Sequence, residues 1–94
     1  MLSQAPIDLG KVKQNEIERE ALRLGIIAEL DAISLYEQLA AVVKKDDMKK
    51  VFLDIAKEEK THVGEFQALL LKYDEEQAEE LEKGREEVEK LTEK

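Results

Sequence analysis

Apolar residues recur at steps of three and four along two long stretches of the chain, which is the period of an α-helix with a buried face. The first stretch, residues 17–43, contains nothing that stops a helix, and the second runs from about residue 48 to residue 73. The polar break between them holds Asp46 and Asp47, either of which we expect to cap the second helix. Because so short a connection makes neighbouring helices antiparallel, the pattern predicts a helical hairpin.

The segment before the hairpin shows no period. Residues 1–13 contain the only Pro of the chain, and we interpret them as a flexible lead. Asn15 and Glu18 have the spacing of a helix N-cap followed by an acid that reaches back to it. We therefore assign the helical hairpin to residues 14–73.

The segment after the hairpin, residues 74–94, is much more polar. Asp74 and Gln77 repeat the capping spacing, so a third helix is expected to begin there and to end near Leu91. The predicted fold class is therefore all-α: an antiparallel two-helix hairpin plus a short C-terminal helix.

The first long helix is apolar around most of its circumference. One stripe comprises Leu22, Ile26, Glu29, Ile33, Tyr36, Ala40 and Val43; the other comprises Ile17, Ala21, Leu24, Ala28, Ala32, Leu35, Leu39 and Val42. A hairpin cannot bury both stripes, and a chain of 94 residues has only a modest core of its own. We therefore expect self-association, in which two hairpins pair into a four-helix bundle.

Three titratable residues interrupt these apolar faces. The core-facing seam of the second helix comprises Met48, Phe52, Ile55, Glu59, His62, Phe66, Leu69 and Tyr73. Glu59 and His62 stand in its middle, and Glu29 stands likewise within its own stripe. At about 1.5 Å per residue, all three lie at nearly the same height above a turn near residue 45. Because a buried carboxylate without compensation costs several kcal/mol, the three side chains need a shared partner.

A pair of metal ions would meet that need. In bundle-type di-iron carboxylate sites, two helices each supply a Glu, and two others each supply a Glu-x-x-His. This chain holds one of each kind, Glu29 and the Glu59–His62 pair, so a two-fold dimer would complete the set. Four carboxylates then balance two divalent cations. The alternative is a polar cluster satisfied within the core, which only sets the register of pairing.

Composition narrows the classes of partner. The net charge is −8, from 23 acidic and 15 basic residues, and such a surface repels phosphate backbones, so we expect no nucleic-acid partner. The absence of Cys excludes disulfides, iron–sulfur clusters and thiolate zinc sites within the chain. No apolar run approaches the ~20 residues of a membrane span, and the first residues lack a signal-peptide pattern. We therefore expect no membrane partner and a cytoplasmic location.

Three segments of the chain also carry a resemblance to a known family. They read Ile26-Ile-Ala-Glu-Leu-Asp-Ala-Ile, Leu35-Tyr-Glu-Gln-Leu-Ala and Glu58-Glu-Lys-Thr-His-Val-Gly-Glu-Phe. Together they closely resemble the encapsulated ferritins, including the ferritin-like domain fused to some archaeal encapsulin shell proteins, over about residues 16–91. The resemblance implies a ferritin-like bundle and a ferroxidase, which oxidises Fe(II) with dioxygen at a di-iron site between two subunits. It further implies a homodecameric ring, and an encapsulin nanocompartment in which the iron is stored.

The resemblance also implies roles for individual residues. The family's ligand positions fall on Glu29, Glu59 and His62. The family's tyrosine beside the site matches Tyr36, which is expected to be catalytic together with those ligands. Of two outer acidic residues that guide iron inward, one matches Asp31 and the other falls on Ala28. Iron is the expected metal, with calcium or zinc as substitutes in a crystal.

Three classes of function stay open at this stage. The first is a ferroxidase. The second is a peroxidase of the rubrerythrin kind, although the missing Cys removes the electron-donating iron centre that such proteins usually carry. The third is a non-catalytic helical assembly module. Metal analysis separates the third class from the other two, and the choice between dioxygen and peroxide as oxidant separates the first from the second.

Overall fold

The computed structural model describes residues 8, 10 and 13–93, and its secondary structure there is entirely helical. A 3-10 turn, η2 (Gln14–Glu16), leads into α1 (Ile17–Val42), which is followed by α2 (Asp46–Tyr73) and α3 (Glu75–Thr92). The predicted all-α class is thus confirmed. Most of the predicted flexible lead, residues 1–7, 9 and 11–12, lies outside the described residues. None of the helices in the described part combines the length and the apolarity that a membrane crossing needs.

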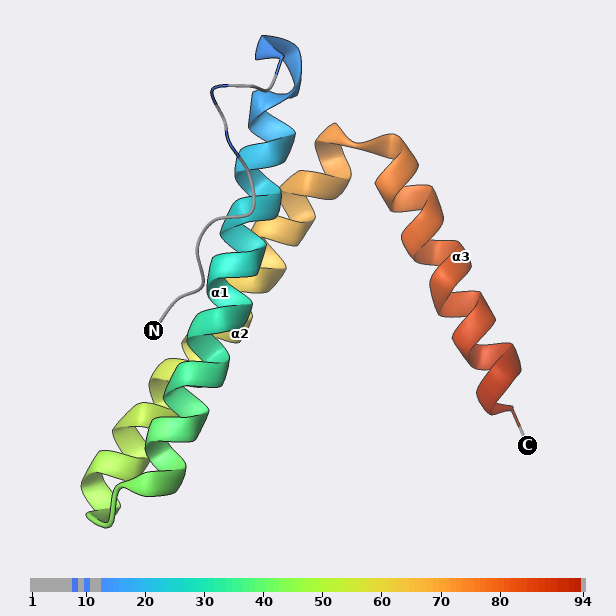
Figure 1. The fold of residues 1–94 in the computed structure, drawn as a ribbon. Helices are drawn as coiled ribbons and strands as arrows, with labels where there is room; N and C mark the ends of the chain where they lie inside the picture. The colour runs from blue at the N-terminus through green and yellow to red at the C-terminus, as the bar shows by residue number, and fades with distance from the viewer. Residues whose placement is uncertain (1–7, 9, 11–12, 94) are drawn as a thin grey trace.

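Helices α1 and α2 run side by side in opposite directions and form the predicted hairpin (Figure 1). A short extended connection joins them, since Val43 and Lys45 both have extended backbone angles. Lys49, in the first turn of α2, donates from Nζ to the carbonyl oxygen of Ala40 at 2.9 Å. Ala40 belongs to the last turn of α1, where carbonyls have few partners, so this bond closes the hairpin at its turn.

Two of the predicted helix starts are wrong. Asn15 lies inside the 3-10 turn instead of at the N-cap, because the backbone closes that turn through a bond from Glu16 N to Lys13 O. At α2 the N-cap is Lys45, and it makes no side-chain cap. Asp46 and Asp47 therefore lie within the first turn of α2, where the helix dipole favours negative charge without a cap geometry.

The hairpin buries little apolar surface by itself. The buried hydrophobic residues of the described chain are Ala40, Ala56 and Leu70. Large apolar side chains remain exposed on every helix: Ile27, Leu30, Val42, Met48, Val51, Leu53, Leu69, Tyr73, Leu81, Val88 and Leu91. On α1, Ile27 and Leu30 lie outside the two predicted apolar stripes, and Val42 is the large apolar residue of those stripes that is exposed. The other large apolar members of the stripes are half-buried in the single chain. The exposed apolar surface therefore lies mostly outside the predicted stripes. Pairing of two chains, which would cover it, stays a prediction.

Helix α3 departs from the hairpin after a bend at Asp74 and projects away from it (Figure 1). None of its residues is buried, whereas the Asp74 side chain is only 7% exposed. Asp74 Oδ1 accepts from the backbone N–H of Gln77 at 3.0 Å, which confirms the predicted cap. Its other oxygen, Oδ2, accepts from Arg23 Nη2 at 2.8 Å. The start of α3 is therefore tied to α1.

Candidate metal centre

The structure brings Glu29, Glu59 and His62 together, at the level where the hairpin register predicts them. Glu29 comes from α1, while Glu59 and His62 lie one turn apart on α2. The Nδ1 atom of His62 lies 3.5 Å from Glu29 Oε2 and 3.4 Å from Glu59 Oε2. One potential ligand atom from each residue lies within 4.8 Å of the other two. The chain thus places two carboxylates and one imidazole at a single point.

The three side chains are partly buried, and the protein does not satisfy all of their hydrogen-bonding atoms. The side chains of Glu29 and Glu59 are 20% and 19% exposed, and that of His62 is 43% exposed. Among the described residues, Glu29 Oε2 is a buried oxygen without a hydrogen-bond partner. An unpaired buried acceptor costs about 1–3 kcal/mol, and more when it is charged. A bound cation would remove that cost.

A protonated His62 lying between two carboxylates is the simplest alternative to a metal. The observed separations of 3.4 and 3.5 Å are longer than the roughly 2.7–2.9 Å of a charge-assisted hydrogen bond. The three side chains therefore lie near one another without forming short hydrogen bonds. This spacing leaves room for a cation between them and favours the metal interpretation.

The donor set fits iron. Carboxylate oxygens and an imidazole nitrogen suit Fe(II), and three ligands from one chain leave coordination positions for a second chain and for oxygen. The described residues bring together no other group of three or more potential ligands of this kind. The group is therefore the candidate metal centre of the chain, and it holds half of a di-iron carboxylate set.

Tyr36 lies outside this group of ligands. It is two turns along α1 from Glu29, and its ring stacks on Phe52 with centroids 6.3 Å apart and an interplanar angle of 21°. Phe52 in turn lies two turns before Glu59 on α2, so the aromatic pair packs the hairpin on the turn side of the centre. A role for Tyr36 in the chemistry stays a prediction.

Asp31 also lies outside the group. Two residues along an α-helix correspond to a rotation of about 200°, so Asp31 points to the opposite side of α1 from Glu29. It lines a surface depression with Ile27, Leu30 and Ser34. Within one chain Asp31 is therefore not a fourth ligand, and its role on an entry path for iron stays a prediction.

Comparison with known proteins places this geometry in a family. A family model described as Rubrerythrin matches residues 20–93. The crystal structure of the encapsulated ferritin domain from Pyrococcus furiosus superposes with a TM-score of 0.83 and 53% identity, over 98% of this chain and 96% of that chain. The chain belongs to the rubrerythrin family, as an encapsulated ferritin.

Two curated relatives of this encapsulated ferritin are longer proteins. A ferritin-like–encapsulin shell fusion protein from Pyrococcus furiosus is 54% identical over 94 residues, which are 98% of this chain and 27% of that protein. The encapsulin nanocompartment cargo protein EncC from Myxococcus xanthus is 37% identical over 68 residues, 72% of this chain and 52% of that protein. The chain thus spans about a quarter and about half of their lengths.

Sequence reasoning missed two contacts of this encapsulated ferritin. One is the bond between Arg23 and Asp74, for which the sequence carries no signal beyond opposite charge. The other is the close packing of Phe66 on Gly25. For that contact a signal exists, since the two residues lie almost equally far from the turn of the hairpin and must therefore meet at one height.

Proposed function

We propose that the chain is a ferroxidase that oxidises Fe(II) to Fe(III) with dioxygen at a di-iron site shared by two copies. The observation that carries the proposal is the group Glu29, Glu59 and His62, with one carboxylate oxygen buried and unpaired. Membership of the encapsulated ferritins supports it. Iron storage and detoxification inside an encapsulin nanocompartment is the proposed context, supported by relatives named as a shell fusion and as a compartment cargo.

A second copy of the chain would supply the other half of the site. One chain contributes two carboxylates and one imidazole, and a di-iron bundle site needs four and two. His62 is 43% exposed, so a partner can reach the group from that side. The exposed apolar residues of the hairpin give the two copies a reason to pair. A decameric ring of such pairs is part of the proposal and rests on the family resemblance.

The side chains would act through charge and position. Two Fe(II) ions bound as substrate would each give one electron to dioxygen, which would take up two protons and leave as hydrogen peroxide while both ions become Fe(III). The carboxylates of Glu29 and Glu59 attract a trivalent ion more strongly than a divalent one, so they favour oxidation. Neutral His62 contributes a nitrogen ligand without adding charge. Asp31 is proposed to attract incoming iron, and Tyr36 to lie beside the chemistry.

The test is aerobic oxidation of Fe(II) by the purified chain, followed by absorbance and oxygen uptake. We expect about one iron per chain at saturation, because each pair of chains shares two. His62→Ala and Glu59→Ala should abolish rapid oxidation. Glu65→Ala is the matched control, since Glu65 is an exposed acid on the same helix and should leave the rate unchanged. Wild-type rates in both ligand variants would refute the assignment.

The match to the Rubrerythrin family model favours a peroxidase as the second candidate. The same iron-loaded protein separates the two candidates. Rapid oxidation of Fe(II) with dioxygen supports the ferroxidase, whereas turnover only with hydrogen peroxide supports the peroxidase. A chain that binds no iron at all supports the third class, a helical assembly module.

A further inference from the structure

The two helices of the hairpin approach each other closely one turn away from the candidate metal centre. Gly25 lies one turn before Glu29 on α1, and Phe66 lies one turn after His62 on α2. A Cβ atom placed on Gly25 would be 3.3 Å from Cδ2 and Cε2 of the Phe66 ring and 3.4 Å from Cζ. Ordinary contacts between carbon atoms are about 3.5–4.0 Å. The ring therefore occupies the space that the missing side chain of Gly25 leaves.

The lack of space beside the Phe66 ring, and not a special backbone conformation, explains why residue 25 is a glycine. Glycine weakens the interior of a helix relative to alanine, so a glycine there needs a reason. No glycine of the described chain has a positive φ angle, and alanine could therefore adopt the backbone of Gly25. Gly64 on α2 provides the contrast, because a Cβ atom there would meet nothing within 4 Å in the chain. Of these two, only Gly25 is required by close packing.

We propose that the Gly25–Phe66 contact positions the metal centre by setting the separation of α1 and α2 at its level. This inference rests on the proposed function and concerns the geometry of the same site. Glu29 is the member of the group on α1, while Glu59 and His62 share α2. The distance between Glu29 and the other two therefore depends on how far apart the helices stand. Phe66 and Gly25 are positioning residues, because they act through that distance.

The tolerance of a metal site makes this spacing matter. Metal–ligand distances must agree to about 0.2 Å, so a displacement of a few tenths of an ångström is enough to disturb a metal site. A methyl group at 3.3 Å from the Phe66 ring requires a shift of a few tenths of an ångström. Over one turn a helix behaves as a rigid rod, so a displacement at Gly25 reaches Glu29. In a two-fold pair both halves of the site would be displaced.

The experiment compares Gly25→Ala with Gly64→Ala, using Co²⁺ as the probe under titration. Co²⁺ accepts the same ligands and binds more tightly than Fe²⁺, and its visible spectrum reports coordination geometry. We expect Gly25→Ala to weaken Co²⁺ binding about 10-fold or more and to change the spectrum. Gly64→Ala should leave both unchanged while raising the melting temperature of the metal-free protein. The assembly size of each variant is measured in parallel.

A double variant and a single variant complete the test. Adding Phe66→Leu to Gly25→Ala makes room for the methyl group and should restore affinity and spectrum toward those of the wild type. Phe66→Leu alone loosens the contact and should weaken Co²⁺ binding. This variant tests the positioning role if Gly25→Ala does not fold. If the folded Gly25→Ala protein has wild-type affinity and spectrum, the positioning role is overturned and the ferroxidase proposal stays intact. The same holds for Phe66→Leu when that variant is used instead. Failure of the wild type to bind either Co²⁺ or Fe²⁺ overturns both.

Discussion

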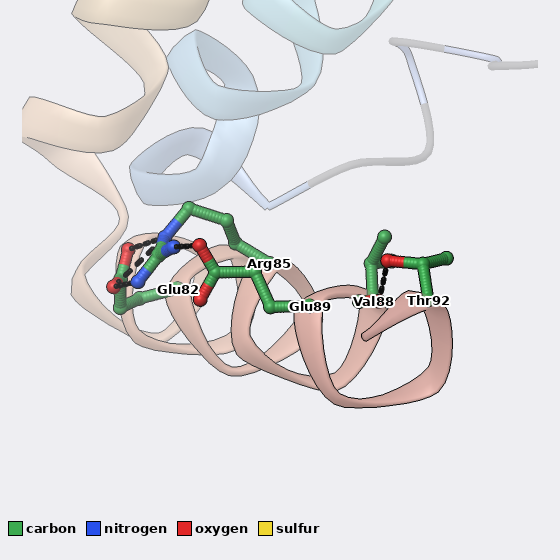
Figure 2. Close-up of polar contacts among 5 residues, drawn as sticks. All are labelled: Glu82, Arg85, Val88, Glu89 and Thr92. Carbon is green, nitrogen blue, oxygen red and sulfur yellow. Dashed lines mark hydrogen bonds and ion pairs between the residues drawn. The ribbon is translucent and has the colours of Figure 1, made fainter. Parts of the chain in front are cut away.

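Glu29 of α1 and Glu82 of α3 differ in how the protein satisfies their carboxylates. On α3, Arg85 donates from Nε to both oxygens of Glu82 at 3.0 and 3.1 Å and from Nη1 to Glu89 at 2.6 Å (Figure 2). These groups lie on one exposed helix, at the three- and four-residue spacings that favour pairing. On α1, Glu29 is half-buried and has one oxygen without a hydrogen bond. Glu82 and Glu89 are thus paired within their own helix, whereas Glu29 could accept a partner from outside the chain.

The hydrogen bonds of the α3 pair also shift its pKa values. The hydrogen bond from Arg85, helped by its charge, lowers the pKa of Glu82 below its ordinary value. The same hydrogen bond raises the pKa of Arg85. Both groups are fully exposed, so water screens the pair and its contribution to stability is small. The Glu82 carboxylate is thus already paired with a cation, whereas the buried oxygen without a hydrogen bond and the nearby Glu59 and His62 make Glu29 a candidate metal ligand.

The largest predicted difference between the two carboxylates is in metal binding, measured by comparing Glu29→Gln with Glu82→Gln. Glu29→Gln removes a proposed ligand and should weaken Co²⁺ or Fe²⁺ binding by more than about 100-fold. It also removes an unpaired charge, so the metal-free protein should become more stable by about 1 kcal/mol. Metal titration and thermal melting without metal measure the two changes. Glu82→Gln should leave metal binding unchanged; equal effects of the two substitutions would contradict the distinction.

The register of the hairpin is the part of the site that the sequence predicts well. Helical period places Glu29, Glu59 and His62 at one height, because every residue of a helix adds the same rise. The cap at Asp74 is likewise local and was predicted correctly. The starts at Asn15 and Asp46 were not predicted correctly, because the first turns there form through backbone hydrogen bonds and the N-cap residues make no side-chain cap.

Long-range contacts could not be predicted in the same way. The N-cap of α3, Asp74, bonds to Arg23, which lies 51 residues earlier in the chain. The height at which Phe66 meets Gly25 follows from the hairpin register, but the ring orientation that places Phe66 against Gly25 does not. The proposed pairing of two chains, which would complete the metal site, involves surfaces that one sequence indicates only through its apolar residues.

A smaller effect, on the free energy of unfolding, is expected at Asp74, where α3 is connected to the hairpin. Asp74→Ala removes both the cap of α3 and the partner of Arg23, so it should destabilise the protein by about 2 kcal/mol. Denaturant unfolding at fixed protein concentration measures this loss. Asp46→Ala is the matched control, because Asp46 pairs with Lys50 at the surface, where both side chains are more than three-quarters exposed. Asp46→Ala should lower the free energy of unfolding by at most about 0.5 kcal/mol. A similar loss in both variants would show that Asp74 does not stabilise the connection between α1 and α3.

The smallest effect is a pH dependence confined to α3. Because its folded pKa is lowered, Glu82 contributes stability above its ordinary value of 4.5 and loses it as the pH falls through the lower folded pKa. The other acids of the chain titrate in the same range, so the measurement is a difference. Far-UV circular dichroism of the wild type should exceed that of Arg85→Ala at neutral pH, and the two should converge as the pH drops below about 4. Arg85→Lys keeps the charge but loses the forked geometry and should fall between them. A constant difference across the whole range would mean that Arg85 supports α3 by packing, and that its exposed carboxylates are no better partnered than Glu29.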